Sequence, residues 1–261
     1  MVRRKEARVT RAAISPPLPE SIILKDPVRA HFRADHYTRI NLRRLEHLAT
    51  LALVKPGMRI LELGAGIGDL TSFFLDRACT VTLVEGRDDN IAICRDRFDG
   101  LQNVECIRLD LDNPEPDPVK HETFDLVFAY GLLYHLEHPA DALRWMADRC
   151  TSTLLLETCV TPDTSEEINP TSEDAGFASQ ALRGTGCRPT RAWVWQQLTQ
   201  RFPFVYTTRT QPNHDEFPLD WSDPAPSATG LHRAIFVASR APLDHHPDLA
   251  PTLLSRHNTS N

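Results

Sequence analysis

Short apolar runs alternate with amphipathic segments along most of this chain, beginning with the run Arg59–Leu63. The runs have the length of buried strands, and the segments between them have helical spacing of apolar residues. Strands that alternate with helices favour a mostly parallel sheet covered on both faces. The sequence therefore predicts a doubly wound α/β sheet of seven strands. The expected strands are Arg59–Leu63, Val81–Val84, Val104–Leu109, Phe124–Ala129, Thr153–Glu157, Phe204–Thr208 and Ala234–Ser239.

The regular pattern occupies the middle of the chain. An amphipathic helix is expected from about residue 35 to 53, and residues 1–34 are expected to form a loosely ordered arm. The predicted domain spans residues 35–240. Its periodicity stops between about 161 and 188, and we interpret this polar stretch as an inserted lid, because long irregular segments of compact domains are usually functional or mobile. Residues 241–261 contain three prolines and are expected to be a flexible tail.

Composition excludes several classes of protein. The 261 residues include 29 Lys or Arg and 35 Asp or Glu, and the formal net charge of −6 disfavours broad electrostatic binding to nucleic acid. No apolar run reaches the ~18 residues that a membrane-spanning helix needs. The six cysteines lack the spacing of a metal finger, and the chain is long for a disulfide scaffold. We therefore expect a globular cytoplasmic protein with reduced thiols and no membrane partner.

A glycine cluster separates the first expected strand from the helix that follows it. Glycines at such a junction let the backbone approach a ligand, and the helix N-terminus offers free N–H groups. A dinucleotide site needs the spacing G-x-G-x-x-G, which brings a pyrophosphate onto the helix. The spacing here is Gly64-x-Gly66-x-Gly68, and Asp69 would repel a pyrophosphate. A glycine turn that serves only helix–sheet packing is the alternative to a ligand site.

With an acid two residues before it, the cluster resembles motif I of the class I S-adenosylmethionine-dependent methyltransferases. The resemblance implies a Rossmann-like fold and S-adenosylmethionine as the cofactor, bound without a phosphate. It implies that Gly64, Ala65, Gly66 and Gly68 hold this cofactor, and the acidic Glu62 suits a cationic ligand.

Acidic residues also end the next two expected strands. Glu85 lies in register with the glycines, where a carboxylate accepts hydrogen bonds from the two hydroxyls of a ribose. For the third strand, the resemblance implies that Asp110 holds the adenine amino group and that Leu111 packs on the ring. Asp112 is a competitor for the acidic role. The resemblance covers roughly residues 35–160, and the whole chain is similar to a bacterial branch of the class that has no assigned substrate.

The stretch Arg39–Leu45, with the sequence RINLRRL, resembles part of the ubiquinone-biosynthesis O-methyltransferases. The resemblance implies that Arg44 contacts the cofactor, and a fixed guanidinium suits the methionyl carboxylate. A solvated helix face is the alternative for this arginine. That branch carries carboxylates around its equivalent of His135, where this chain has Gly131 and Tyr134. The departure argues against a metal ion and against a catechol-like acceptor.

Catalytic candidates follow the fourth and fifth strands, because ligands of open α/β sheets bind at the carboxyl ends of the strands. The resemblance implies that the backbone of Tyr130 lies near the methionyl group. His135 is a candidate general base, since imidazole titrates near neutrality, with support of the loop as the alternative. Tyr134 either packs or touches the acceptor. Glu157 is a candidate for binding a hydroxyl or amine of the acceptor, with an ordinary strand-end acid as the alternative.

Candidates for binding the acceptor lie farther along the chain. Arg188 suits an anionic group of the acceptor, and a solvated arginine at a helix start is the alternative. Asn213, His214 and Trp221 follow the strand Phe204–Thr208. We expect this loop and the inserted lid to cover the acceptor pocket.

The sequence therefore predicts an S-adenosylmethionine-dependent methyltransferase that methylates a small-molecule acceptor, at oxygen, by in-line displacement. Three alternatives stay open: an RNA-modifying methyltransferase, a cofactor-binding module without catalysis, and a nicotinamide oxidoreductase. The segment after the fourth strand lacks the Asn- or Asp-Pro-Pro-Tyr/Phe run of base-amino methylation, which disfavours the RNA alternative. A homodimer is compatible with all of these.

Overall fold

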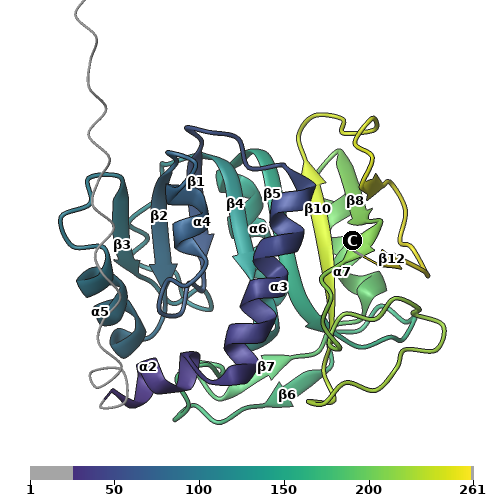
Figure 1. Ribbon diagram of the computed structural model, residues 1–261, viewed down its shortest axis with the longest axis horizontal. Helices are drawn as coiled ribbons and strands as arrows, with labels where there is room; N and C mark the ends of the chain where they lie inside the picture. The colour runs from purple at the N-terminus through teal and green to yellow at the C-terminus, as the bar shows by residue number, and fades with distance from the viewer. Residues whose placement is uncertain (1–25, 260–261) are drawn as a thin grey trace, which may run out of the picture.

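The computed structural model describes residues 26–259, and its centre is one eight-stranded sheet (Figure 1). The strand order is β11-β8-β10-β5-β4-β1-β2-β3. Strands β1 to β5 run parallel to one another, whereas β10 is antiparallel to β5 and β8, and β11 is antiparallel to β8. The predicted doubly wound, mostly parallel sheet is confirmed, with one strand more than expected. The strands are β1 Arg59–Leu63, β2 Thr80–Glu85, β3 Val104–Arg108, β4 Phe124–Tyr130, β5 Cys150–Val160, β8 Phe204–Thr208, β10 His232–Ser239 and β11 Leu249–Ala250.

Helices cover both faces of the sheet, and successive residues of β4 show this directly. Val127 and Ala129 belong to a core formed with α6 and α7, whereas Leu126 and Phe128 belong to a second core formed with α3, α4 and α5. This alternation follows from the two-residue period of a strand. Within residues 26–259, no helix has the length and apolarity needed to cross a bilayer. The helices are α2 Pro27–Phe32, α3 Asp35–Leu51, α4 Thr71–Leu75, α5 Asp88–Arg97, α6 Pro139–Arg149 and α7 Arg191–Thr199, with the 3-10 turn η1 Leu133–His135.

The order of the strands reverses between β1 and β4. From β1 the chain continues through β2 to β3, and it then returns to β4 and β5 on the other side of β1. Such a switch point leaves a crevice at the carboxyl ends of the strands. The arrows of β2 and β4 point to this edge in Figure 1, where α2 and the hairpin of β6 (Pro170–Ser172) and β7 (Thr185–Cys187) also lie.

Helix α2 corrects the expectation of a loose arm over residues 1–34. Asp26 caps this helix, since its Oδ1 accepts the backbone N–H groups of Val28 and Arg29. Pro27 occupies the first helical position, where a missing N–H costs nothing. The rest of the arm, residues 1–25, lies outside the described residues.

The C-terminal segment corrects the expectation of a flexible tail. β11 pairs with β8, and β12 (Asn258–Thr259) pairs with β9 (Thr210–Gln211). Nδ1 of His257 donates to the carbonyl of Thr208 at 2.7 Å, and Nε2 of His47 on α3 donates to the carbonyl of Thr210 at 3.0 Å. Two-residue strands have no readable periodicity, which is why the sequence pattern missed this edge.

Acid is expected to destabilise this edge of the fold. Burial lowers the pKa of His47 to about 4 and that of His257 to about 4. The folded chain therefore keeps both imidazoles neutral, whereas the unfolded chain binds protons as the pH falls below about 6.5. Between pH 6.5 and 4 we expect each histidine to lower the free energy of unfolding by on the order of 2–3 kcal/mol. Urea unfolding at stepped pH measures the loss.

His47→Gln keeps a donor for the carbonyl of Thr210 and removes the titrating group, so its free energy of unfolding should depend less on pH. The same change at the exposed His245 is the control and should leave the wild-type slope. An unchanged slope in His47→Gln would contradict the burial argument.

Candidate active site

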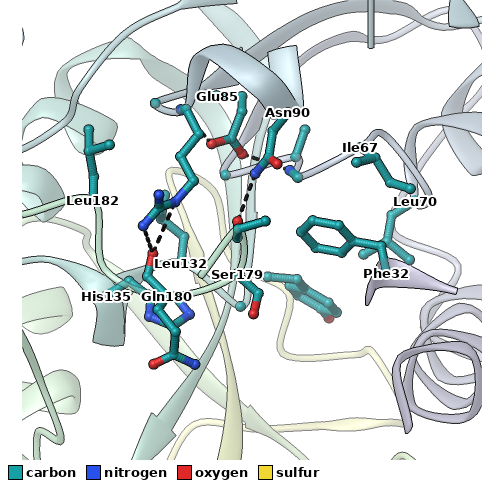
Figure 2. Close-up of a pocket in the computed structure, with 18 of the residues that line it drawn as sticks. Phe32, Ile67, Leu70, Glu85, Asn90, Leu132, His135, Ser179, Gln180 and Leu182 are labelled. Carbon is teal, nitrogen blue, oxygen red and sulfur yellow. Dashed lines mark hydrogen bonds between the residues drawn. The ribbon is translucent and has the colours of Figure 1, made fainter. Parts of the chain in front are cut away.

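A pocket lies at the carboxyl ends of β1 to β4, bounded by α2, α3 and the segment between β6 and β7. In Figure 2, Phe32 and Leu70 lie on one side of it, and His135 and Leu182 lie on the other. Across residues 26–259, His, Cys, Asp and Glu side chains form no cluster of three that could hold a metal ion. The predicted site residues that line the pocket are Arg44, Gly64, Ala65, Gly66, Glu85, Asp110, Leu111, Tyr130, Tyr134 and His135.

The glycine loop after β1 leaves room for a ligand because its residues lack side chains. Gly64 and Gly66 have φ angles of 64° and 58°, which L side chains rarely adopt. A Cβ at Gly66 would lie 3.0 Å from Cε1 of Phe32, at the edge of the pocket. The N–H of Gly66 donates to Oε2 of Glu85 at 2.8 Å and ties the loop to the end of β2.

Carboxylates line one end of the pocket. Glu85 ends β2, and burial raises its pKa although its oxygens accept backbone N–H groups of Arg87 and the glycine loop. Asp110 follows β3, and its Oδ2 lies 2.9 Å from the guanidinium of Arg183. Leu111 adds an apolar surface beside it. Such groups can accept hydrogen bonds from the hydroxyls and the exocyclic amine of a nucleoside and cover its base.

A buried network of ion pairs lies beneath the other end of the pocket. Glu157 is 0 % exposed and accepts hydrogen bonds from Nη2 of Arg44 at 2.5 Å and from Nη1 of Arg233 at 3.0 Å. Arg233 also donates to Glu216 and, through Nη2 at 3.1 Å, to the hydroxyl of Tyr134. Both guanidinium groups line the pocket, whereas Glu157 lies beneath them. Arg44 is 7 % exposed, so a solvated helix face is the wrong interpretation of this arginine.

His135 lines the pocket from the turn η1, and its Nδ1 lies 2.5 Å from Oε2 of Glu173. Oε1 of Glu173 accepts a hydrogen bond from Nη1 of Arg188 at 2.9 Å. Burial lowers the pKa of His135, and the hydrogen bond and charge of Glu173 oppose the shift only in part. The imidazole is therefore neutral near pH 7. With its Nδ1 proton donated to a carboxylate, its Nε2 keeps a lone pair that can accept a proton.

Besides Glu157, three predicted residues lie outside the lining although they are close to it. Glu62 lies under the glycine loop, where its Oε2 accepts a hydrogen bond from Oγ1 of Thr71 at 2.7 Å and burial raises its pKa to about 7. Gly68 has a positive φ, but the space that its Cβ would fill holds the ring of Phe98. Arg188 does not line the pocket, since its guanidinium is bound by the carboxylate next to His135 as described above.

The acceptor candidates after β8 also lie outside the pocket. Trp221 is buried against the C-terminal segment, and its Nε1 donates to Nε2 of His257 at 3.0 Å. Asn213 is exposed and does not line the pocket. His214 stands one layer away, because its ring packs edge-on against His36, which does line the pocket, with 6.0 Å between centroids.

Two important lining residues were missed from the sequence. Phe32 closes the pocket over the glycine loop, but it lies in the segment that was expected to be a loose arm. Arg233 had a readable signal, because it is a charged residue at the start of an apolar run that was correctly expected to be a strand. A charged side chain in such a run needs a buried partner, here Glu157 and Glu216.

A crevice at the switch point, a G-x-G-x-G loop after β1 and carboxylates at the ends of β2 and β3 together define a class I S-adenosylmethionine-dependent methyltransferase. A family model described as a methyltransferase domain matches residues 31–207, well over half of the chain. The chain therefore belongs to this methyltransferase domain family. S-adenosylmethionine is its cofactor, and the side-chain-free loop and the two strand-end carboxylates fit this group.

Two curated relatives come from species of Methanosarcina, and both are described as a probable ribosomal RNA small subunit methyltransferase A. The relative from Methanosarcina mazei is 31% identical over 147 residues, which is 50% of this chain and 54% of the relative. The relative from Methanosarcina acetivorans is 38% identical over 88 residues, 33% of each protein. The chain thus aligns with about half or less of the length of these relatives.

Solved structures share the fold. The N-terminal domain of EvdMO1 with bound SAH has a TM-score of 0.61 and 20% identity, and the match covers 79% of this chain and 84% of that one. Magnesium protoporphyrin IX methyltransferase from Synechocystis PCC 6803 with bound SAM has a TM-score of 0.52 and 13% identity, over 83% of this chain and 85% of that one. At these identities, the likeness concerns the fold alone.

Gly66→Val is expected to weaken the binding of S-adenosylmethionine by about tenfold or more, because a β-branched residue at positive φ costs ~1–3 kcal/mol and forces the loop to move. Its Cβ would also press on Phe32. Isothermal titration calorimetry measures the change. Gly100→Val is the matched control, since Gly100 has a φ of 75° and no neighbour within 4 Å of a Cβ. Equal affinities for the two variants would contradict the role of the loop.

Proposed function

We propose that this methyltransferase transfers a methyl group to a hydroxyl oxygen of a small-molecule acceptor, with His135 as the general base. The observation that carries the proposal is the pairing of Nδ1 of His135 with Glu173 inside the pocket, at 2.5 Å. That pairing directs the proton of the neutral imidazole to Nδ1, and it leaves Nε2 as a proton acceptor.

S-adenosylmethionine supplies, when bound, an electrophilic methyl group on a sulfonium whose leaving group is a neutral thioether. A hydroxyl is a weak nucleophile, so removal of its proton during the transfer matters. Nε2 of His135 takes this proton, and the negative charge of Glu173 stabilises the imidazolium that forms. Arg44 and Arg233 hold their places through Glu157 and offer N–H groups that orient polar parts of the ligands.

A small acceptor is supported by the segment that borders one side of the pocket. Ala178, Ser179, Gln180 and Leu182, from the segment between β6 and β7, line the pocket. Figure 2 shows Ser179, Gln180 and Leu182 across the pocket from Ile67 and Leu70. A pocket narrowed in this way admits a small molecule more readily than a structured polynucleotide, and the net charge of −6 opposes phosphate binding. The six cysteines are free thiols, which fits the reducing cytoplasm that we propose as the compartment.

Methylation of ribosomal RNA is the second candidate, because the two Methanosarcina relatives carry that description. Its support is limited to alignments over about half or less of their length. The two candidates predict label in different chemical fractions of a cell.

The experiment uses the purified full chain and S-adenosylmethionine with a deuterated methyl group. A bacterial extract is separated into small molecules and total RNA, and each fraction is incubated with the protein and analysed by mass spectrometry. We expect deuterated label in a small molecule and none in RNA nucleosides. Gly66→Val, incubated in parallel, identifies label that does not depend on the cofactor loop. Label confined to RNA nucleosides would replace the first candidate by the second.

A further inference from the structure

Residues 173–183, here called the cover loop, are held against the cofactor end of the pocket by side chains from other elements. Arg87, two residues after the end of β2, contacts three carbonyl groups of this loop. Its guanidinium donates to the carbonyls of Ala175 at 2.9 Å, Gln180 at 2.8 Å and Ala181 at 3.0 Å. One cation, which lies beside the ribose-binding candidate Glu85, therefore holds three carbonyl groups of the loop.

Three more contacts hold the cover loop to separate elements. Nδ2 of Asn90 on α5 donates to the carbonyl of Ala178 at 2.9 Å, as the dashed line in Figure 2 shows. Arg183 pairs with Asp110 after β3 at 2.9 Å. Nε2 of His31 on α2 lies 2.7 Å from Oγ of Ser179. The loop is thus docked on the same elements that carry the cofactor-binding candidates.

The cover loop begins with Glu173, the residue that binds His135. Oε2 of Glu173 accepts two contacts at once, from Nδ1 of His135 at 2.5 Å and from the N–H of Ala181 at 2.6 Å. Ala181 is also one of the residues whose carbonyl accepts from Arg87. A short path of hydrogen bonds therefore joins the side chain of Arg87, through the backbone of Ala181, to the carboxylate that orients the imidazole.

We propose that Glu173 is a positioning residue for His135, and that docking of the cover loop on Arg87 delivers Glu173 to the imidazole. The inference rests on the proposed function, in which His135 is the general base. In the docked state the carboxylate holds the Nδ1 proton, and Nε2 is ready to accept the proton of the acceptor. With the loop undocked, His135 loses this partner and becomes a weaker, unoriented base. Deprotonation of the acceptor is thereby linked to a closed cofactor site.

The charges around His135 determine in which direction its pKa should change when Glu173 is replaced. Arg188, beyond β7, and Arg233, on β10, lower the pKa of His135, although burial lowers it most. The ring of Tyr134 packs on the imidazole, with 3.9 Å between centroids. Glu173 contributes the opposing negative charge and hydrogen bond. Loss of Glu173 leaves the imidazole among cations, so its pKa should fall further.

The test is nuclear magnetic resonance of the full chain labelled with 15N at histidine and saturated with S-adenosylhomocysteine. It reads the pKa and the tautomer of His135, whose signal is assigned by its loss in His135→Asn. We expect Glu173→Gln to lower this pKa by about one unit or more, because a neighbouring opposite charge shifts a pKa by about 1–3 units. We also expect it to weaken the preference for the Nδ1–H tautomer, because a neutral amide can present either its oxygen or its NH2 group to Nδ1. Arg87→Ala should change both readouts in the same direction by a smaller amount, although Arg87 does not touch the imidazole.

Arg108→Ala is the matched control, because Arg108 pairs with Asp88 on the exposed side of α5, 3.2 Å apart, and should leave His135 as in the wild type. Unchanged pKa and tautomer in Glu173→Gln would overturn the positioning role. If His135 keeps its wild-type pKa and tautomer in Arg87→Ala, docking of the cover loop on Arg87 does not position Glu173, and that part of the proposal is overturned. If Glu173→Gln does not fold, Glu173→Ala, which also removes the carboxylate, replaces it, and an unaltered tautomer and pKa would again overturn the role. The resonance experiment needs no acceptor, so its outcome does not depend on turnover. Full turnover by His135→Asn would refute His135 as the general base, and this result is distinguishable from a failure of the positioning role.

Discussion

The variant His135→Asn should turn over about 100-fold more slowly than the wild type or worse, since a positioned general base contributes roughly 10²–10⁴-fold. Asparagine donates a hydrogen bond to Glu173 as the imidazole does, so the pocket keeps its shape, but its amide cannot take a proton. Affinity for S-adenosylhomocysteine should therefore stay close to that of the wild type. Steady-state kinetics with the acceptor identified from the extract, together with calorimetry, separate the two effects.

The pH dependence of turnover provides the second readout for this variant. Because burial holds the pKa of His135 below its usual value of 6.5, kcat of the wild type should rise with pH below neutrality and level off near pH 7. This rise should be absent in His135→Asn. His138→Asn alters an exposed histidine three residues away and is the control. Equal losses of turnover and cofactor affinity in His135→Asn would indicate a structural role.

Arg233→Met should lower the free energy of unfolding by about 3–5 kcal/mol, because loss of one partner leaves a buried charge uncompensated. Glu157 and Glu216 are both 0 % exposed, and both are paired with Arg233. Arg44 still pairs with Glu157, whereas the carboxylate of Glu216 keeps, within the described residues, only the hydroxyl of Thr229 at 2.8 Å and the imidazole of His36 at 3.5 Å. Urea unfolding at pH 7 measures the difference.

The loss should shrink in acid. Burial alone would raise the pKa of Glu216, but the charge and hydrogen bond of Arg233, together with the hydrogen bond of Thr229 and the charge of His36, outweigh it and lower this pKa below the usual 4.5. The stabilisation is therefore present above about pH 4.5 and disappears as the pH falls through the lower folded value. Arg144→Met is the control, because Arg144 and its partner Asp141 are both exposed and such pairs are worth about 0–1 kcal/mol. A loss in Arg233→Met no larger than in this control would contradict a buried network.

Local patterns account for what the sequence could predict. The strands β1 to β4 are short apolar runs bounded by turns. Their observed ends agree with the ends expected from the sequence to within one or two residues. Because parallel strands end at one edge of the sheet, the residues that follow them were expected to meet there. Gly66, Glu85, Asp110 and His135 do line one pocket. Each of these residues could be predicted to lie at the pocket because it follows closely, in the sequence, the end of an expected strand.

Contacts between distant segments could not be predicted in this way. His135 and Glu173 are 38 positions apart, and Glu173 lies in a stretch without periodicity. Arg233 meets Glu157 because β10 pairs antiparallel with β5, and the register of that pairing has no signal in a single sequence. Trp221 was wrongly expected at the acceptor pocket for a related reason. It follows β8 in the sequence, but the sequence does not show in which direction the loop after β8 runs.

The chemical position of the transferred methyl group tests the central claim most directly. The small molecule that gains deuterated methyl in the extract is purified, and fragmentation and nuclear magnetic resonance identify the atom that carries the label. We expect the label on oxygen, formed by the wild type and nearly absent with His135→Asn. Label on carbon or nitrogen, or equal labelling by both proteins, would contradict methyl transfer to a hydroxyl that His135 deprotonates.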